Sequence, residues 1–117
     1  MELSQEQISH ADQLIYRFSQ LQDTIGNKLF PLILQGLGEY SPNMPFIDIL
    51  NQLEKLSVIE STEHWLSLRE IRNLVTHEYP GNEKEIVDAL NELHQQTFYL
   101  SSTLDNLMLY IKNRKWI

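Results

Sequence analysis

Apolar residues recur at steps of three and four along the first third of the chain, which is the period of an amphipathic α-helix. They are Ile8, Ala11, Ile15, Phe18, Ile25, Leu29 and Leu32, and Gln22 interrupts them. Ser4 and Gln7 stand in the spacing of a capping box, so we expect the helix to begin there. Pro31 cannot donate a backbone hydrogen bond, so we expect a bend or an end at that residue.

Two shorter helices are expected in the middle of the chain. Residues 36–45 combine glycine and proline without an apolar period, which predicts a loop. Pro45 suits a first helical position, so a short second helix is expected after it. Its inward residues would be Phe46, Ile49, Leu50, Leu53 and Leu56. A third helix is expected to start at Ser61 or Thr62 and must stop before Pro80.

The last third of the chain has the longest apolar seam. Asn82 and Glu85 have the spacing of a helix start. The seam consists of Ile86, Leu90, Leu93, Thr97, Leu100, Leu104, Leu107 and Ile111. No segment alternates with period two over the length of a strand. We therefore expect residues 1–117 to form one all-α domain, an antiparallel bundle of four or five helices.

Composition and charge narrow the function. The 117 residues include no cysteine, which excludes disulfides, thiol nucleophiles and thiolate-bound metals. Sixteen acidic and nine basic residues give a formal charge of −7, so any nucleic-acid site must be local. The N-terminus lacks the pattern of a secretory signal, and no apolar run reaches membrane-spanning length. We expect a cytoplasmic protein that binds neither membranes nor DNA.

Arg72 is the most unusual residue of the third expected helix. On a helical wheel it falls inside the apolar arc, between Trp65 and Tyr79. A guanidinium there must be paired with an acid, stacked on the aromatic rings, or aimed into a groove where an anion binds. The wheel alone does not separate an ion pair with a neighbouring helix from an anion site.

His77 lies in the last turn of the same helix, where the helix dipole favours the charged imidazolium. It stands five residues beyond Arg72, so on an ideal helix the two side chains diverge by about 140°. They can converge if the helix distorts before Pro80, or if two copies of the chain related by a twofold axis share one site. A helix cap without chemistry is the alternative for His77, and completion of the apolar arc is the alternative for Tyr79.

The sequence of residues 72–79, Arg-Asn-Leu-Val-Thr-His-Glu-Tyr, resembles the Arg-x4-His-x-Tyr signature of the HEPN superfamily. The resemblance is to HepT-like toxins and to the related nucleotidyltransferase substrate-binding proteins. Helical order and length are similar too, and outside residues 61–82 the resemblance is one of pattern. It implies a homodimer, alone or within a larger heteromer, whose two motifs line one cleft and cut RNA without metal or cofactor. The remaining histidines also lack metal-site spacing.

The resemblance implies a role for each motif residue. Arg72 would hold the phosphoryl oxygens while a ribose 2′-OH attacks the adjacent phosphate. His77 would transfer a proton to or from the 2′-OH or the departing 5′-oxygen. Asn73 would orient His77 or donate to phosphate, and an exposed helical asparagine is the simpler interpretation. Tyr79 matches the tyrosine to which a nucleotidyltransferase antitoxin attaches AMP in HepT-like toxins, which would block the groove by charge and bulk.

Two functions follow from the resemblance. The first is the toxin of a type VII-like toxin–antitoxin pair, a metal-independent endoribonuclease that cleaves tRNA or mRNA and is neutralised by a cognate minimal nucleotidyltransferase. The second is a non-catalytic substrate-binding or regulatory subunit of a nucleotidyltransferase. The net charge favours the second, and the intact set of Arg72, His77 and Tyr79 favours the first. A plain helical dimerisation module is the third alternative.

Overall fold

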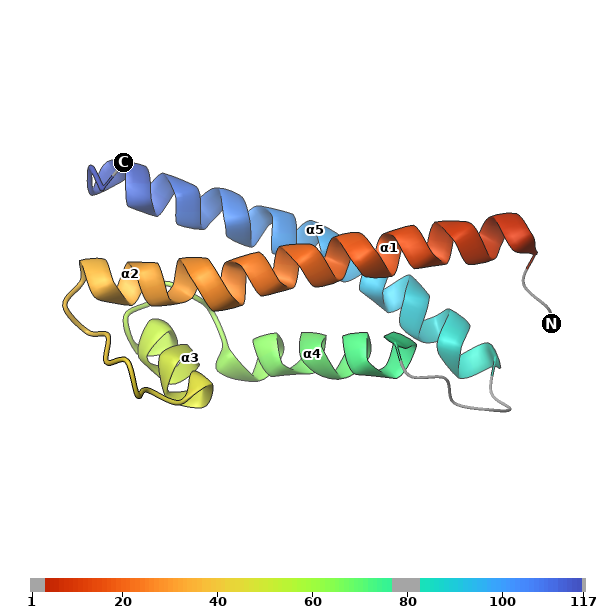
Figure 1. The fold of residues 1–117 in the computed structure, drawn as a ribbon, viewed down its shortest axis with the longest axis horizontal. Helices are drawn as coiled ribbons and strands as arrows, with labels where there is room; N and C mark the ends of the chain where they lie inside the picture. Colours follow the sequence, from red (N-terminus) through yellow and green to blue (C-terminus); the bar gives the residue numbers. More distant parts are fainter. Residues whose placement is uncertain (1–3, 77–82, 117) are drawn as a thin grey trace.

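The computed structural model describes residues 4–76 and 83–116, and within these ranges the chain forms helices and no strands. The elements are α1 (Gln5–Thr24), a π-helical turn η1 (Ile25–Leu29), α2 (Phe30–Gly36), α3 (Phe46–Lys55), α4 (Thr62–Thr76) and α5 (Glu83–Asn113). Figure 1 shows α1, η1 and α2 as one continuous rod. The described residues thus form four rods, which confirms the expected all-helical architecture.

The directions of the rods differ from those of an up-and-down bundle. In Figure 1, α4 runs antiparallel to both α1 and α5, whereas α1 and α5 run the same way and cross. The helix α3 has only 10 residues and packs against α2 and α4 near one end of the bundle. Because α3 does not traverse the bundle, only three long rods alternate in direction: the rod that begins with α1, then α4, then α5. The first and the last of these therefore point the same way. The antiparallel arrangement therefore holds for α4 and not for the α1–α5 pair.

Pro31 lies inside the first rod without ending it. A proline ring presses on the carbonyl four residues earlier and offers that carbonyl no N–H group. Here that carbonyl belongs to Asn27, which lies in η1, and the backbone N–H of Phe30 donates to the carbonyl of Ile25 across this wider turn. The bend expected at Pro31 is replaced by a π-helical turn directly before it, a local widening typical of such sites.

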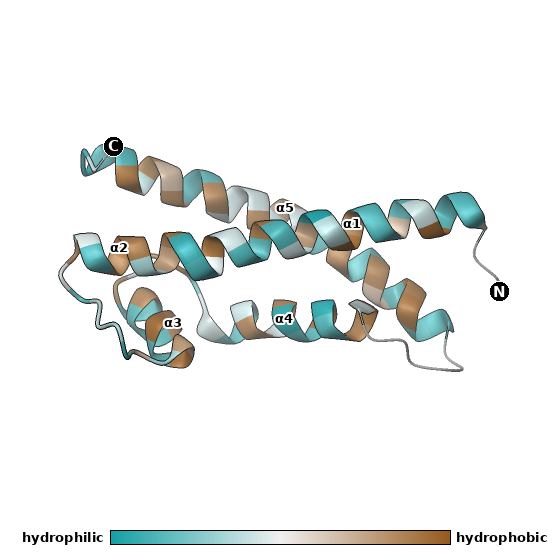
Figure 2. Ribbon diagram, in the orientation of Figure 1, coloured by the Kyte–Doolittle hydropathy of each residue, from teal (hydrophilic) through white to brown (hydrophobic). Residues whose placement is uncertain are grey.

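The core runs along the faces that the apolar period predicted. In Figure 2 each labelled helix carries both hydrophilic and hydrophobic turns, as amphipathic helices packed around a core do. The largest fully buried side chains are Trp65, Phe18, Phe30, Ile25, Ile33, Leu34, Leu50, Leu53, Leu68, Leu93, Leu100 and Leu107. The prediction was wrong for Ile8, Leu32 and Leu56, which are 45%, 46% and 37% exposed. Ile8 and Leu56 lie at a bundle end and a helix end. Leu32 follows the π-helical turn, which shifts the helical repeat, so Ile33 and Leu34 are buried in its place.

Three helices end in the same way. Gly38, Ser57 and Lys115 adopt left-handed backbone conformations, with φ angles of 74°, 60° and 61°. After each, the next backbone N–H donates to the carbonyl five residues back, at distances of 2.8, 2.9 and 3.2 Å, which is the Schellman pattern. At the end of α5 this turn directs Trp116 back onto α2, where its ring covers Gly36.

Candidate functional site

The helix α4 carries the candidate residues and is fixed at its first turn. The Ser61 hydroxyl accepts a backbone hydrogen bond within that turn at 3.1 Å. The carboxylate of Glu54, on α3, accepts from the N–H of Thr62 at 2.6 Å. The expected start at Ser61 or Thr62 is confirmed. Because Trp65 and Leu68 are buried, α4 is held in one rotational orientation about its axis. This orientation sets the direction in which Arg72 points.

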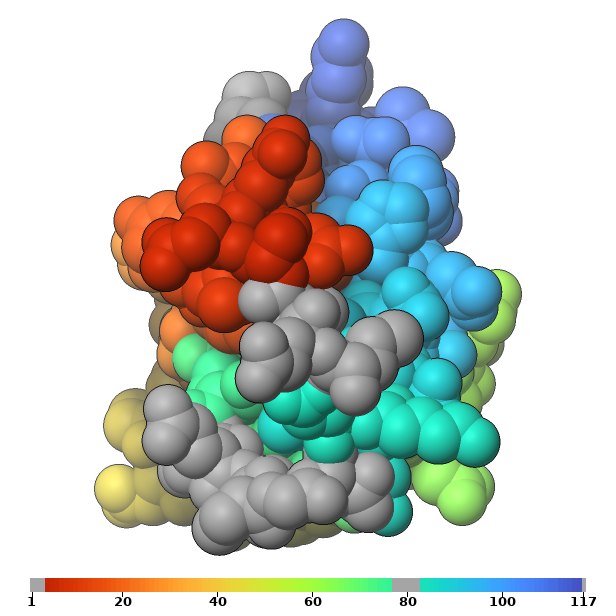
Figure 3. Space-filling model, turned by 90° about the vertical axis from the view of Figure 1, so that its right-hand side faces the viewer, coloured from red at the N-terminus to blue at the C-terminus, as the bar shows by residue number. Residues whose placement is uncertain are grey.

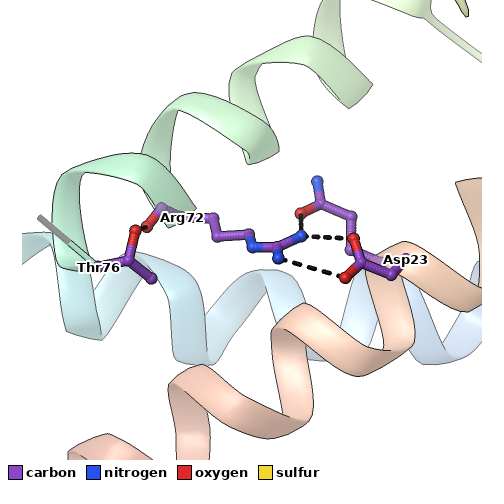
Figure 4. A network of polar contacts seen from close by, with 4 residues as sticks. Asp23, Arg72 and Thr76 are labelled. Carbon is purple, nitrogen blue, oxygen red and sulfur yellow. Dashed lines mark hydrogen bonds and ion pairs between the residues drawn. The ribbon is translucent and has the colours of Figure 1, made fainter.

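Arg72 reaches from α4 to the C-terminal end of α1, as Figure 4 shows. Its Nη1 donates to Oδ1 of Asp23 at 2.6 Å, and its Nη2 donates to Oδ2 at 3.3 Å. This is the ion pair with a neighbouring helix that the wheel left open. The side chains of Arg72 and Asp23 are 28% and 48% exposed. Because water screens a pair of this kind, it contributes on the order of 1 kcal/mol or less to stability.

Gln22 accounts for the polar interruption in the first apolar seam. Its side chain faces the core and the residue is 3% exposed. Its Oε1 accepts from Nη1 of Arg72 at 3.4 Å, so it helps to hold the guanidinium. Its Nε2 is buried and has no hydrogen-bond partner among residues 4–76 and 83–116. A buried amide nitrogen of this kind is costly to leave unpaired.

A hollow of about 440 Å³ lies beside this ion pair. Its lining residues are Gln22, Asp23, Arg69, Arg72, Asn73 and Thr76. The guanidinium carbon of Arg69 lies 4.8 Å from the ring centroid of Phe46, so the ring supports this second cation. Two guanidinium groups against one carboxylate leave the lining positive on a protein of net charge −7. Oxyanions are the ligands that planar guanidinium groups favour.

Asn73 and Thr76 occupy the same side of α4 in different ways. The Thr76 hydroxyl donates to the backbone carbonyls of Arg72 and Asn73, at 2.9 and 3.3 Å, and is therefore engaged by its own helix. Asn73 is exposed, and in the described part of the chain its amide makes no hydrogen bond. The exposed amide of Asn73 therefore remains open to a ligand in the hollow.

The structure brings together some of the expected residues and adds others. Arg72 and Asn73 share the hollow, whereas His77 and Tyr79 lie outside the described residues. Asp23 and Gln22 were missed, since they come from α1, about 50 positions earlier in the chain. The interruption of the apolar seam was a signal for Gln22, and nothing in the sequence distinguished Asp23 from the other acids of α1.

Comparisons with protein-family models, with curated proteins and with solved structures find no match for the chain. The resemblance to the HEPN superfamily therefore stays a prediction, made from residues 72–79 and from the expected helical order. Over residues 4–76 and 83–116, no helix is both long and apolar enough to cross a membrane. In the same ranges, no three acidic or histidine side chains gather where they would hold a metal ion.

Proposed function

We propose that this protein is a HepT-like toxin of the HEPN superfamily, a homodimeric endoribonuclease that needs no metal and is neutralised by a nucleotidyltransferase. The observation that carries the proposal is the positive hollow on α4, where Arg72 is held in one orientation and remains 28% exposed. A guanidinium that is both oriented and reachable suits the recognition of a phosphodiester. His77 follows the last described residue of α4, and histidine is the residue type suited to proton transfer near neutral pH.

The proposed reaction is an internal transesterification of RNA. A ribose 2′-oxygen attacks the adjacent phosphorus, the bond from phosphorus to the 5′-oxygen breaks, and a 2′,3′-cyclic phosphate and a free 5′-OH form. The proton of the 2′-OH ends on the departing 5′-oxygen, and His77 takes part in that transfer. Arg72 stabilises the negative charge that builds on the phosphoryl oxygens. The reaction consumes no co-reactant, because the attacking and leaving oxygens both belong to the RNA.

Neutralisation would use the same site. The phenol of Tyr79 would lose its proton to water, and its oxygen would attack the α-phosphorus of ATP, held by the partner nucleotidyltransferase, while pyrophosphate leaves. The attached AMP carries a phosphate that the cations of the hollow, Arg69 and Arg72, would bind in place of RNA. This inhibitor is covalent and anionic, so it would compete by charge as well as by bulk.

The test is cleavage of tRNA and mRNA by the purified protein in the presence of a metal chelator. We expect products with 2′,3′-cyclic phosphate ends, and we expect Arg72→Ala and His77→Ala to lower the rate by about 100-fold or more. Arg17→Ala and His10→Ala are the matched controls, because both residues are exposed on α1 away from the hollow. Intact RNA with the wild type, or equal rates for all four variants, would contradict the proposal.

A non-catalytic subunit of a nucleotidyltransferase is the second candidate, and the net charge of −7 favours it because the overall field repels RNA. The hollow would then hold the phosphate of a nucleotide without bond cleavage. RNA that stays intact, together with nucleotide binding that Arg72→Ala removes, would identify this function.

A further inference from the structure

We propose that Asp23 is a positioning residue for the reaction, which holds Arg72 by the tip of its guanidinium so that the side edge of the same group faces the scissile phosphate. The inference rests on the proposed function, since the anion is taken to be an RNA phosphate. Asp23 lies on α1, and among the described residues its side chain has hydrogen bonds with the Arg72 guanidinium only, so it would act through Arg72 and not on the RNA.

The first step is the hydrogen-bond geometry of the guanidinium. An arginine side chain has five N–H donors in one plane, arranged as a tip formed by both Nη atoms and a side edge formed by Nε and Nη2. Asp23 accepts from Nη1 and Nη2 together, which is a contact with the tip, and Gln22 accepts from Nη1. Within residues 4–76 and 83–116, Nε has no acceptor. The side edge is therefore left for two oxygens of one phosphate.

The second step concerns what a fixed guanidinium contributes. Arginine is long and flexible, and ordering it when a ligand arrives reduces the gain from the contact. Asp23 and Gln22 order Arg72 before the ligand binds. Their own positions are fixed because Phe18 on α1 and Ile25, the first residue of η1, are buried on either side of them. A donor fixed in advance stabilises charge that develops in a transition state without reorganisation.

The third step is the balance of charge. A carboxylate beside a phosphate weakens the binding of that phosphate, so Asp23 costs ground-state affinity while it improves orientation. Arg69, stacked on Phe46, keeps the hollow positive in spite of Asp23. Removal of the Asp23 charge should therefore lower the rate of the chemical step while it leaves RNA binding unchanged or stronger.

The experiment compares Asp23→Asn with the wild type on an RNA that the wild type cleaves. We expect kcat to fall by about tenfold or more, and KM to stay within about threefold or to fall. Asp12→Asn is the matched control, because it removes one exposed carboxylate from the same helix away from the hollow, and it should change neither constant. A lowered kcat with unchanged helical circular dichroism supports the role. An unchanged kcat, or a loss confined to KM, overturns it.

A second readout does not depend on cleavage. In protein labelled with ¹⁵N-arginine, Arg72 should give separate, slowly rotating Nη–H signals, and these should merge in Asp23→Asn and persist in Asp12→Asn. A 2′-O-methyl RNA hexamer should shift the Nε–H and Nη2–H signals of Arg72 and leave its Nη1–H signals in place. If the hexamer binds through Arg72 and the Nη–H signals already rotate freely in the wild type, the inference is overturned and the proposed function stands. If the wild type binds no hexamer and cleaves no RNA, the proposed function fails and the inference fails with it.

Discussion

The two ends of the bundle are built differently. Where α2 and α3 meet the start of α4, large side chains are fully buried, and the rings of Phe30 and Trp65 lie with their centroids 4.8 Å apart. The opposite end, which faces the viewer in Figure 3, contains the first turns of α1, the end of α4 and the start of α5. Among the described residues, none of α1 before Phe18 and none of α4 after Leu68 is buried.

The candidate site lies on the border between these ends. Arg72 lies one turn beyond the buried Leu68, and Asp23 lies in the last turn of α1, directly after the buried Gln22. The packed end, where α2 and α3 meet the start of α4, thus fixes the backbone on both sides of the ion pair. The open end, which contains the first turns of α1 and the end of α4, leaves the guanidinium reachable. Sites on rigid elements with exposed polar tips are the ones that hold a reacting group accurately.

The largest expected difference between the ends is in stability. Leu68→Ala removes a fully buried side chain and should lower the free energy of unfolding by about 2–5 kcal/mol. Leu74→Ala makes the same change six residues further along α4, where the side chain is partly exposed, and should cost about 1 kcal/mol. Urea unfolding followed by circular dichroism measures both. Equal losses would mean that the two ends are packed alike.

A smaller effect is expected at the outer limit of the packed end. A Cβ atom at Gly36 would stand 2.5 Å from the ring of Trp116, so Gly36→Ala must displace the ring and should cost about 1–3 kcal/mol. In a Trp116→Ala background the same substitution should cost nothing, because the obstructing ring is gone. A double-mutant cycle of urea unfolding measures this coupling, and additive losses would show that Trp116 does not lie on α2.

The smallest effect is a pH dependence of the packed end. Burial raises the pKa of Tyr99 above its ordinary value of 10.0, Glu60 adds to the rise, and a hydrogen bond with Thr103 opposes it. As pH increases, the unfolded chain loses this proton first, so stability is full below about pH 10 and falls as pH rises through the folded pKa. Tyr99→Phe should reduce this loss of stability at high pH. Tyr16→Phe is the control and should not, because Tyr16 is 66% exposed. The urea concentration at the unfolding midpoint, measured near pH 8 and above pH 10, gives this loss of stability. If the midpoint falls equally in the two variants, the raised pKa is contradicted.

Much of the fold could be predicted from the sequence, because it follows from local signals. The capping box of Ser4 and Gln7 forms as expected, with hydrogen bonds of 2.8 and 3.1 Å. The period of three and four placed most core residues, since burial on a helix follows its repeat. The crossing of α1 and α5 was missed because it depends on how far α3 extends, which no local pattern states.

The site was predicted only in part. Arg72 was singled out because a cation in an apolar arc needs a partner, and the structure supplies Asp23. The partner itself could not be named, because α1 carries several acids and only the packing of α1 against α4 selects one. Gln22 was noted as an interruption, and its contact with Arg72 depends on the same packing. Long-range pairs of this kind have no signal in a single sequence.

The central claim is that the hollow on α4 binds an RNA phosphate, and an amide NMR titration tests it most directly. A 2′-O-methyl RNA hexamer, which cannot be cleaved, would be added to ¹⁵N-labelled protein. We predict that the largest shifts fall on residues 22–23 and 69–76, and that Arg72→Ala removes them. Shifts confined to residues 112–115, which include Lys112, Arg114 and Lys115, or no shifts at all, would contradict the account.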